Sequence, residues 1–126
     1  MNSKAVPHLP KHMISEYMRE INNIRNEKIR ANSLSKAVPH LQEYMISEYM
    51  REIHHIQNEK IRADALSKAV PLLPEKMIYE YVNEIRNIKD IYLRAKLLID
   101  VSSKLPDSEK KRILKEALNL LDSTRF

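Results

Sequence analysis

The segment 74–89 alternates apolar and polar residues with the period of an α-helix. Its apolar residues follow the spacing i, i+1, i+4, i+5, i+8 and i+11: Met77, Ile78, Tyr81, Val82, Ile85 and Ile88. This spacing places them on one side of a helix and the polar residues on the other. Pro74 opens the segment, as proline often does in the first turn of a helix. We therefore predict an amphipathic helix here and name this type the A helix.

A second, shorter helix follows each A helix. In the segment 27–38 we expect the buried side to be formed by Ile29, Ala31, Leu34, Ala37 and Val38. Good helix N-caps stand just before this segment and its later copies, namely Asn26, Asn58 and Asp90. Pro39 should stop the helix, because proline cannot continue it. We name this type the B helix.

Both helix types recur because the chain repeats itself every 32 residues without a gap. The repeats are 3–34, 35–66 and 67–98, and a shortened copy, 99–126, keeps the register. The first two repeats are identical at 24 of 32 positions, and the second and third at 17 of 32. A period of this length is typical of arrays in which each unit buries its apolar face on its neighbours.

We predict a single all-α domain over 1–126. The fold class is a right-handed α-solenoid of about three and a half helical hairpins, each 32 residues long, with seven helices in all. The predicted helices span 10–25, 27–38, 42–57, 59–70, 74–89, 91–104 and 107–122. The sixth should run on toward Lys104, because Ser103 stands where the earlier copies have proline.

The B helix of the third repeat carries Leu93-Arg94-Ala95 after Asp90, with Leu98 behind. This pattern resembles the second helix of HEAT repeats, and it fits them better than tetratricopeptide repeats. The resemblance implies a scaffold that binds a protein or peptide, without a cofactor, on a concave surface lined by the B helices. The residues that would face the ligand are Lys28, Asn32, Lys60, Asp64, Tyr92, Lys96 and Ile99.

Two members of this stripe, Tyr92 and Ile99, break its polar pattern. If they are exposed, they mark a contact site, since exposed apolar groups are typical of interaction surfaces. The alternative is that the extended last B helix tucks them under the C-terminal helix. The sequence leaves these two interpretations open.

Each B helix also carries an arginine that projects toward its buried side. We expect a buried charge to be paired. Glutamates border the apolar face of the A helices, so each arginine should bridge the glutamate of its own repeat and that of the next. The predicted structural ladder consists of Arg30, Arg62, Arg94, Glu20, Glu52, Glu84 and Glu116.

The composition argues against several classes of function. The chain has no cysteine and no glycine, so thiolate metal sites, a cysteine nucleophile and glycine-rich phosphate loops are excluded. No run approaches the roughly 18 apolar residues of a membrane span, and the N-terminal residues lack the apolar stretch of a signal peptide. We expect a cytoplasmic protein without a membrane segment.

Candidate catalytic and metal-binding groups also fit structural roles better. His54 and His55 are adjacent and point about 100° apart on a helix, and the other histidines, His8, His12 and His40, lie near prolines. Glutamate pairs such as Glu16 and Glu20 recur in every repeat, whereas an active site is normally a single place. We therefore predict no metal site, no catalytic residues and no enzymatic activity.

Three tyrosines, Tyr17, Tyr49 and Tyr81, lie inside the apolar stripe of the A helices and should be core residues. The net charge of +5, from 22 basic and 17 acidic side chains, is scattered along the chain. Nucleic-acid repeats need basic and aromatic residues on one exposed face. Nucleic acid is therefore the runner-up ligand. An engineered or recently duplicated array with no evolved ligand is a further alternative.

The two ends of the array differ. The C-terminal helix has Glu109, Lys110 and Lys111 where internal A helices have apolar residues, which is typical of a cap. The first A helix keeps internal-type residues: Met13, Ile14, Tyr17 and Met18. Part of its apolar face should therefore lie bare, and the same face of a second chain would cover it. This predicts a homodimer through the N-terminal repeat.

Overall fold

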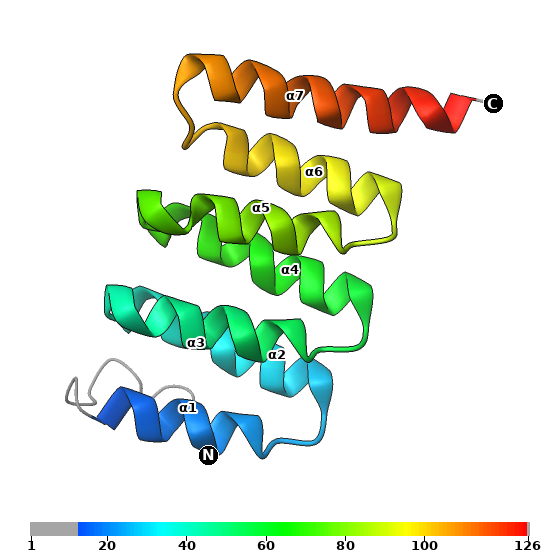
Figure 1. Cartoon of the computed structure of the whole chain (residues 1–126). Coiled ribbons are helices and arrows are strands. Elements are labelled where there is room, and N and C mark those ends of the chain that lie inside the picture. The colour runs from blue at the N-terminus through cyan, green and yellow to red at the C-terminus, as the bar shows by residue number, and fades with distance from the viewer. Residues whose placement is uncertain (1–12, 126) are drawn as a thin grey trace. The chain divides into compact units, whose positions relative to one another are not determined.

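The computed structural model describes residues 13–125, which contain seven α-helices and no strand (Figure 1). The α-helices are α1 (Ile14–Asn22), α2 (Glu27–Ala37), α3 (Glu43–His54), α4 (Glu59–Ala69), α5 (Ile78–Arg86), α6 (Ile91–Ser102) and α7 (Asp107–Asp122). Four 3-10 turns accompany them: η3 (Val38–His40), η4 (Val70–Leu72), η5 (Glu75–Met77) and η6 (Ser123–Arg125). The all-α class and the seven helices are confirmed.

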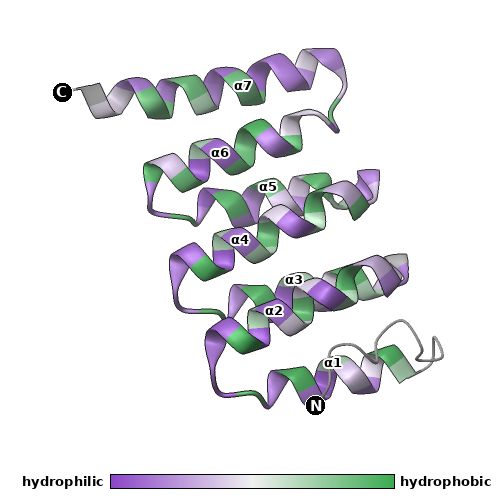
Figure 2. Cartoon of the chain, turned by 180° about the vertical axis from the view of Figure 1, so that it is seen from behind, coloured by the Kyte–Doolittle hydropathy of each residue, from purple (hydrophilic) through white to green (hydrophobic). Residues whose placement is uncertain are grey.

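The chain divides into two compact units, Met1–Leu73 and Pro74–Phe126. We call them unit 1 and unit 2 and describe each by itself. In unit 1, α1 packs against α2, α3 packs against α4, and α2 lies directly beside α4. Its A helices, α1 and α3, form one layer and its B helices, α2 and α4, the other, as the front and rear views agree (Figure 1, Figure 2). In unit 2, α6 packs against both α5 and α7.

The predicted N-caps start three helices. The side chains of Asn26, Asn58 and Asp90 each accept the backbone N–H of the residue three positions on, at 3.0 Å in every case. A cap of this kind satisfies one of the N–H groups that have no partner within the first turn. The same local chemistry therefore places the start of α2, α4 and α6 at equivalent points of the three repeats.

The first two B helices end two residues before the predicted prolines, one residue earlier than expected. The α-helix α2 ends at Ala37, and the chain continues through Pro39 as the 3-10 turn η3. Proline lacks the N–H that an α-helix needs and fits the first turn of a new segment instead. In α6, where Ser103 replaces that proline, the helix ends at Ser102 and does not reach Lys104. The lack of proline thus lengthens it by a single residue relative to α2.

The apolar stripe of the A helices forms the core, as predicted. Met77, Ile78, Tyr81, Val82, Ile85 and Ile88 are all buried, and so are Tyr17 and Tyr49. The Tyr49 hydroxyl donates a hydrogen bond of 2.9 Å to the carbonyl of Ala65, which ties α3 to α4. Burial raises the pKa of this phenol well above its ordinary value.

Two predictions about buried and bare residues are wrong. Ile29, expected on the buried side of α2, has 54% of its surface exposed, because the buried arc is formed by Ala31, Leu34, Ala37 and Val38 without it. The apolar face of α1 is not bare: Ile14, Tyr17 and Met18 are buried within the chain, and Met13 alone among the four is exposed, at 37%. Residues 10–12 of the first predicted helix lie outside the described residues.

Candidate binding surface

The exposed side of α2 and α4 carries the predicted ligand-facing residues of unit 1. Lys28, Asn32, Lys60 and Asp64 are all exposed. Because residues four apart shift by only about 40° around a helix, Lys28 and Asn32 share one face of α2, and Lys36 continues it. Figure 2 shows hydrophilic and hydrophobic residues alternating along both helices. We call the exposed side of α2 and α4 the B face of unit 1.

The B face of unit 1 is predominantly cationic. Its exposed charged residues are Lys28, Lys36, Lys60, Lys68 and Asp64. Asp64 is paired with Lys68 through a contact of 3.4 Å within α4. Within the described part of the chain, Lys28 and Lys60 form no ion pair. Lysines thus outnumber aspartates four to one among the exposed charged residues of this face.

In unit 2 the predicted ligand-facing residues lie on α6. Tyr92, Lys96 and Ile99 are exposed, Tyr92 at 65% and Ile99 at 43%. The interpretation that α7 covers Tyr92 and Ile99 is therefore wrong. The Tyr92 hydroxyl lies 3.4 Å from the Thr124 hydroxyl, farther than in a typical O–H···O hydrogen bond. The α6 helix thus presents an aromatic ring and an aliphatic side chain where α2 and α4 present lysine and serine.

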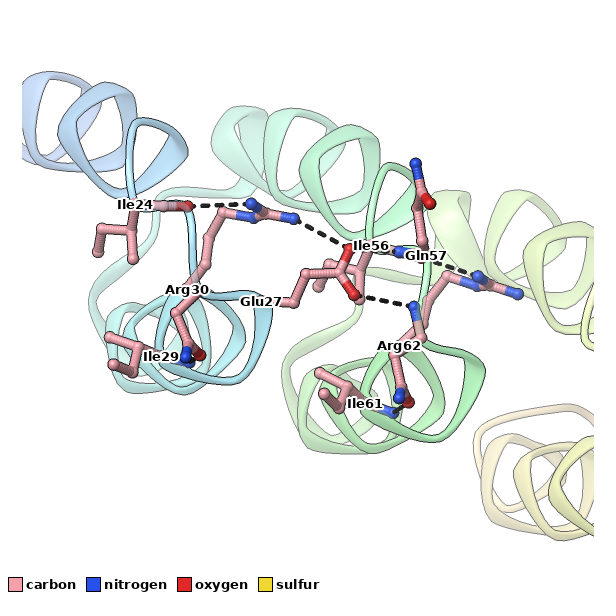
Figure 3. Close-up of polar contacts among 10 residues, drawn as sticks. Ile24, Glu27, Ile29, Arg30, Ile56, Gln57, Ile61 and Arg62 are labelled. Atoms are coloured by element: carbon pink, nitrogen blue, oxygen red, sulfur yellow. Dashed lines mark hydrogen bonds and ion pairs between the residues drawn. The ribbon is translucent and has the colours of Figure 1, made fainter.

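Two of the three arginines of the predicted ladder are largely covered, with different partners from those predicted. Arg30 Nη1 donates 3.0 Å to the carbonyl of Ile24, and its Nη2 lies 3.4 Å from Glu27 Oε2 (Figure 3). Arg62 repeats this arrangement with the carbonyl of Ile56 at 2.8 Å and with Glu59 at 3.3 Å. The two side chains are only 17% and 14% exposed. Their partners lie on the B helix and the loop before it, so the expected pairing with Glu20 and Glu52 is replaced.

Glu27 provides a link between repeats that the sequence analysis missed. Its carboxylate accepts the backbone N–H of Gln57 at 2.7 Å and that of Asn58 at 2.9 Å (Figure 3). These two bonds, followed by the nearby Arg30 and Arg62, lower the pKa of Glu27 below its ordinary value. Because Asn58 is the N-cap of α4, Glu27 joins the first turn of α2 to the point where α4 begins.

Arg94, the third member of the ladder, lacks this carboxylate. Ile91 stands at the position of Glu27 and Glu59, three residues before the arginine. Arg94 Nε is buried and has no hydrogen-bond partner among the described residues. Glu116, one of its predicted partners, pairs instead with Arg86, at 2.9 and 3.2 Å. Glu84, the other, is half-buried on α5.

A second tie joins α5 to α7. The Tyr79 hydroxyl donates to the Glu109 carboxylate, and this bond raises the pKa of the phenol. Together with the Arg86–Glu116 pair it borders a small hollow of about 70 Å³, whose lining includes Val82 and Ile113. Glu109, expected as a solvated residue of a polar cap, therefore anchors α7.

Residues 13–125 provide neither a cluster of metal ligands nor a membrane-spanning helix. No group of three or more histidine and acidic side chains is placed to hold a metal ion. None of the helices described here is long and apolar enough to cross a membrane. His54 and His55 pack edge to face, with ring centroids 5.8 Å apart, and His40 is exposed in η3. His8 and His12 lie outside the described residues.

No family model, curated protein or solved structure matches the chain. The resemblance to HEAT repeats therefore rests on the sequence pattern around Asp90 and Arg94. What the chain does has to be argued from its exposed faces.

Proposed function

We propose that this chain is a non-catalytic protein-binding module of the HEAT-like, right-handed α-solenoid type, and that its ligands bind the exposed side of the B helices. The observation that carries the proposal is the exposed stripe at equivalent positions of three helices: Lys28 and Asn32 on α2, Lys60 and Asp64 on α4, and Tyr92, Lys96 and Ile99 on α6. Exposed tyrosine and isoleucine residues favour contact with another protein, because large apolar groups are costly to leave in water.

The experiment that tests the proposal is site-specific photo-crosslinking in cells that make the protein. A photoreactive amino acid replaces Asn32 or Lys96 on the B helices, or Glu16 or Glu80 on the A helices. All four positions are exposed. The proposal predicts discrete crosslinked proteins from the B-helix positions alone. Equal crosslinking from the A-helix positions would contradict it, as would crosslinks to nucleic acid in place of protein.

We also predict a homodimer through the N-terminal repeat, although fewer exposed apolar residues support it than the sequence suggested. Of the residues expected to be bare, Met13 is exposed, whereas Met18 is buried. Light scattering coupled to size exclusion should compare the wild type with Met13→Glu. A dimer that this variant splits would support the prediction, and a wild-type monomer at tens of micromolar would contradict it.

A further inference from the structure

We infer that the B face of unit 1 binds an acidic, leucine-containing segment of a partner protein; this inference rests on the proposed function and names the class of ligand. Its first support is the register of the two helices. Glu27, in the first turn of α2, accepts the N–H of Asn58, the N-cap of α4. The two helices therefore start side by side, and Ile29 and Ile61 leave them in the same direction (Figure 3).

This register groups the lysines into two rows. Lys28 lies beside Lys60, and Lys36 lies beside Lys68, because each pair holds equivalent positions on neighbouring helices. Along each helix the two lysines are eight residues apart, or about 12 Å. Packed helices lie roughly 8–10 Å apart. A short segment that crosses the two helices, with carboxylates at this interhelical spacing, can reach Lys28 and Lys60 at once.

The predominantly positive charge of the B face of unit 1 favours a negatively charged ligand. Asp64 is the one acidic residue among the exposed positions of α2 and α4, and it is paired with Lys68. Lys28 and Lys60 have no acidic partner in the described residues. An anionic segment gains attraction at both, while a cationic one is repelled.

An apolar contact lies next to these charges. Ile29, adjacent to Lys28 in the sequence, is 54% exposed, and Ile61 beside Lys60 is half-buried. An apolar side chain of the ligand, placed between its carboxylates, covers Ile29 and adds the area burial that charge pairs alone do not provide. The ligand is therefore acidic and amphipathic.

A protein segment suits this face better than a nucleic acid. Single-stranded nucleic acids bind aromatic platforms beside basic residues, and the exposed positions of α2 and α4 include no aromatic residue. Asn32 offers an amide that can bond a peptide backbone.

The test uses the full chain and two fluorescent probes, a 14-residue peptide of glutamates interrupted by leucines and a thymidine 20-mer, in a fluorescence anisotropy titration. The Lys28→Glu/Lys60→Glu variant is expected to weaken peptide binding about tenfold, because two attractive contacts become repulsive. Ile29→Ser is expected to weaken peptide binding about threefold, because it removes an apolar contact. The control is Arg19→Glu/Arg51→Glu, which makes the same charge change at exposed sites of α1 and α3 and should leave binding within about twofold.

Equal losses in the lysine and arginine variants would overturn the inference, because binding would then follow net charge alone. Tighter binding of the thymidine 20-mer with the same lysine dependence would also overturn it in favour of nucleic acid. Circular dichroism first establishes that each variant keeps the helical spectrum of the wild type, and only such variants are compared for peptide binding. The crosslinking experiment separates failure of this inference from failure of the proposed function. If the proteins crosslinked at Asn32 are still captured in the Lys28→Glu/Lys60→Glu variant, the acidic ligand is ruled out and the binding surface is retained.

Discussion

The carboxylate of Glu27 accepts the backbone N–H of Asn58 at 2.9 Å, although 31 residues separate the two. Asn58 in turn accepts the N–H of Ile61 and so begins α4. One glutamate therefore couples the first turn of one B helix to the cap of the next. The arrangement uses a charged acceptor, which makes stronger hydrogen bonds than a neutral one.

Glu27→Ala should lower the free energy of unfolding by about 1–2 kcal/mol, because two backbone N–H groups lose a charged acceptor at a partly exposed site. Urea denaturation followed by circular dichroism measures this change. Glu80→Ala is the matched control, since Glu80 is exposed and its side chain forms no hydrogen bond or ion pair among the described residues. Equal effects of the two substitutions would show that the link to Gln57 and Asn58 is not stabilising.

The stability contributed by Glu27 should depend on pH. Its pKa in the folded protein lies below the ordinary value of 4.5, so folding favours the carboxylate. The contribution is complete above the unfolded pKa and is lost as the pH falls through the lower, folded pKa. The difference in unfolding free energy between wild type and Glu27→Gln should therefore shrink between neutral pH and about pH 3. A difference that stays constant over this range would contradict the assignment.

Arg62 and Arg94 hold the same position in two repeats and should respond differently to replacement by methionine. Arg62→Met should destabilise by about 1–3 kcal/mol, because the buried Ile56 carbonyl loses its donor. Arg94→Met should be neutral or stabilising, because it removes a buried Nε that has no hydrogen-bond partner in the described residues. Thermal denaturation of the two variants, measured side by side, tests the contrast. Equal losses would mean that Arg94 has a stabilising partner.

Tyr49 and Tyr17 provide a second matched pair. The Tyr49 hydroxyl bonds the Ala65 carbonyl, so Tyr49→Phe should cost about 1 kcal/mol. The Tyr17 hydroxyl is buried without a hydrogen-bond partner in the part of the chain that the structure describes, so Tyr17→Phe should be neutral or slightly stabilising. Chemical denaturation of both variants measures the difference. A larger loss for Tyr17→Phe than for Tyr49→Phe would contradict this account.

Local rules predicted the helices of this chain well. The spacing of Met77, Tyr81 and Ile85 identified a buried stripe, and the caps at Asn58 and Asp90 follow from the chemistry of their own side chains. These features depend on neighbours within a turn or two along the chain. Because the chain is repetitive, the apolar spacing and the N-caps are each tested at equivalent positions of several repeats.

The contacts between elements were harder to predict. Glu27 was missed because its partners lie 30 and 31 residues away and are backbone groups, which no side-chain pattern reveals. Arg62 was assigned to Glu52 or Glu84, yet it pairs with Glu59, three residues before it on the same helix. Ile29 was assigned to the core because its residue type is apolar, but the arc that packs is set by Ala31 and Leu34. A signal for Glu27 exists in the repeats: glutamate occurs at 27 and 59 and isoleucine at 91.

The most direct test of the central claim, that the exposed side of the B helices is the binding surface, is a chemical-shift titration. The ¹⁵N-labelled chain is titrated with the glutamate–leucine peptide, and amide shifts are mapped onto the sequence. The account predicts the largest changes at Lys28, Asn32, Lys60 and Asp64, all exposed on α2 and α4, and small changes at Glu16 and Arg51 on the A helices. Changes centred on α1 and α3 would contradict it, whereas the lack of a saturable change at millimolar peptide would contradict the acidic ligand alone.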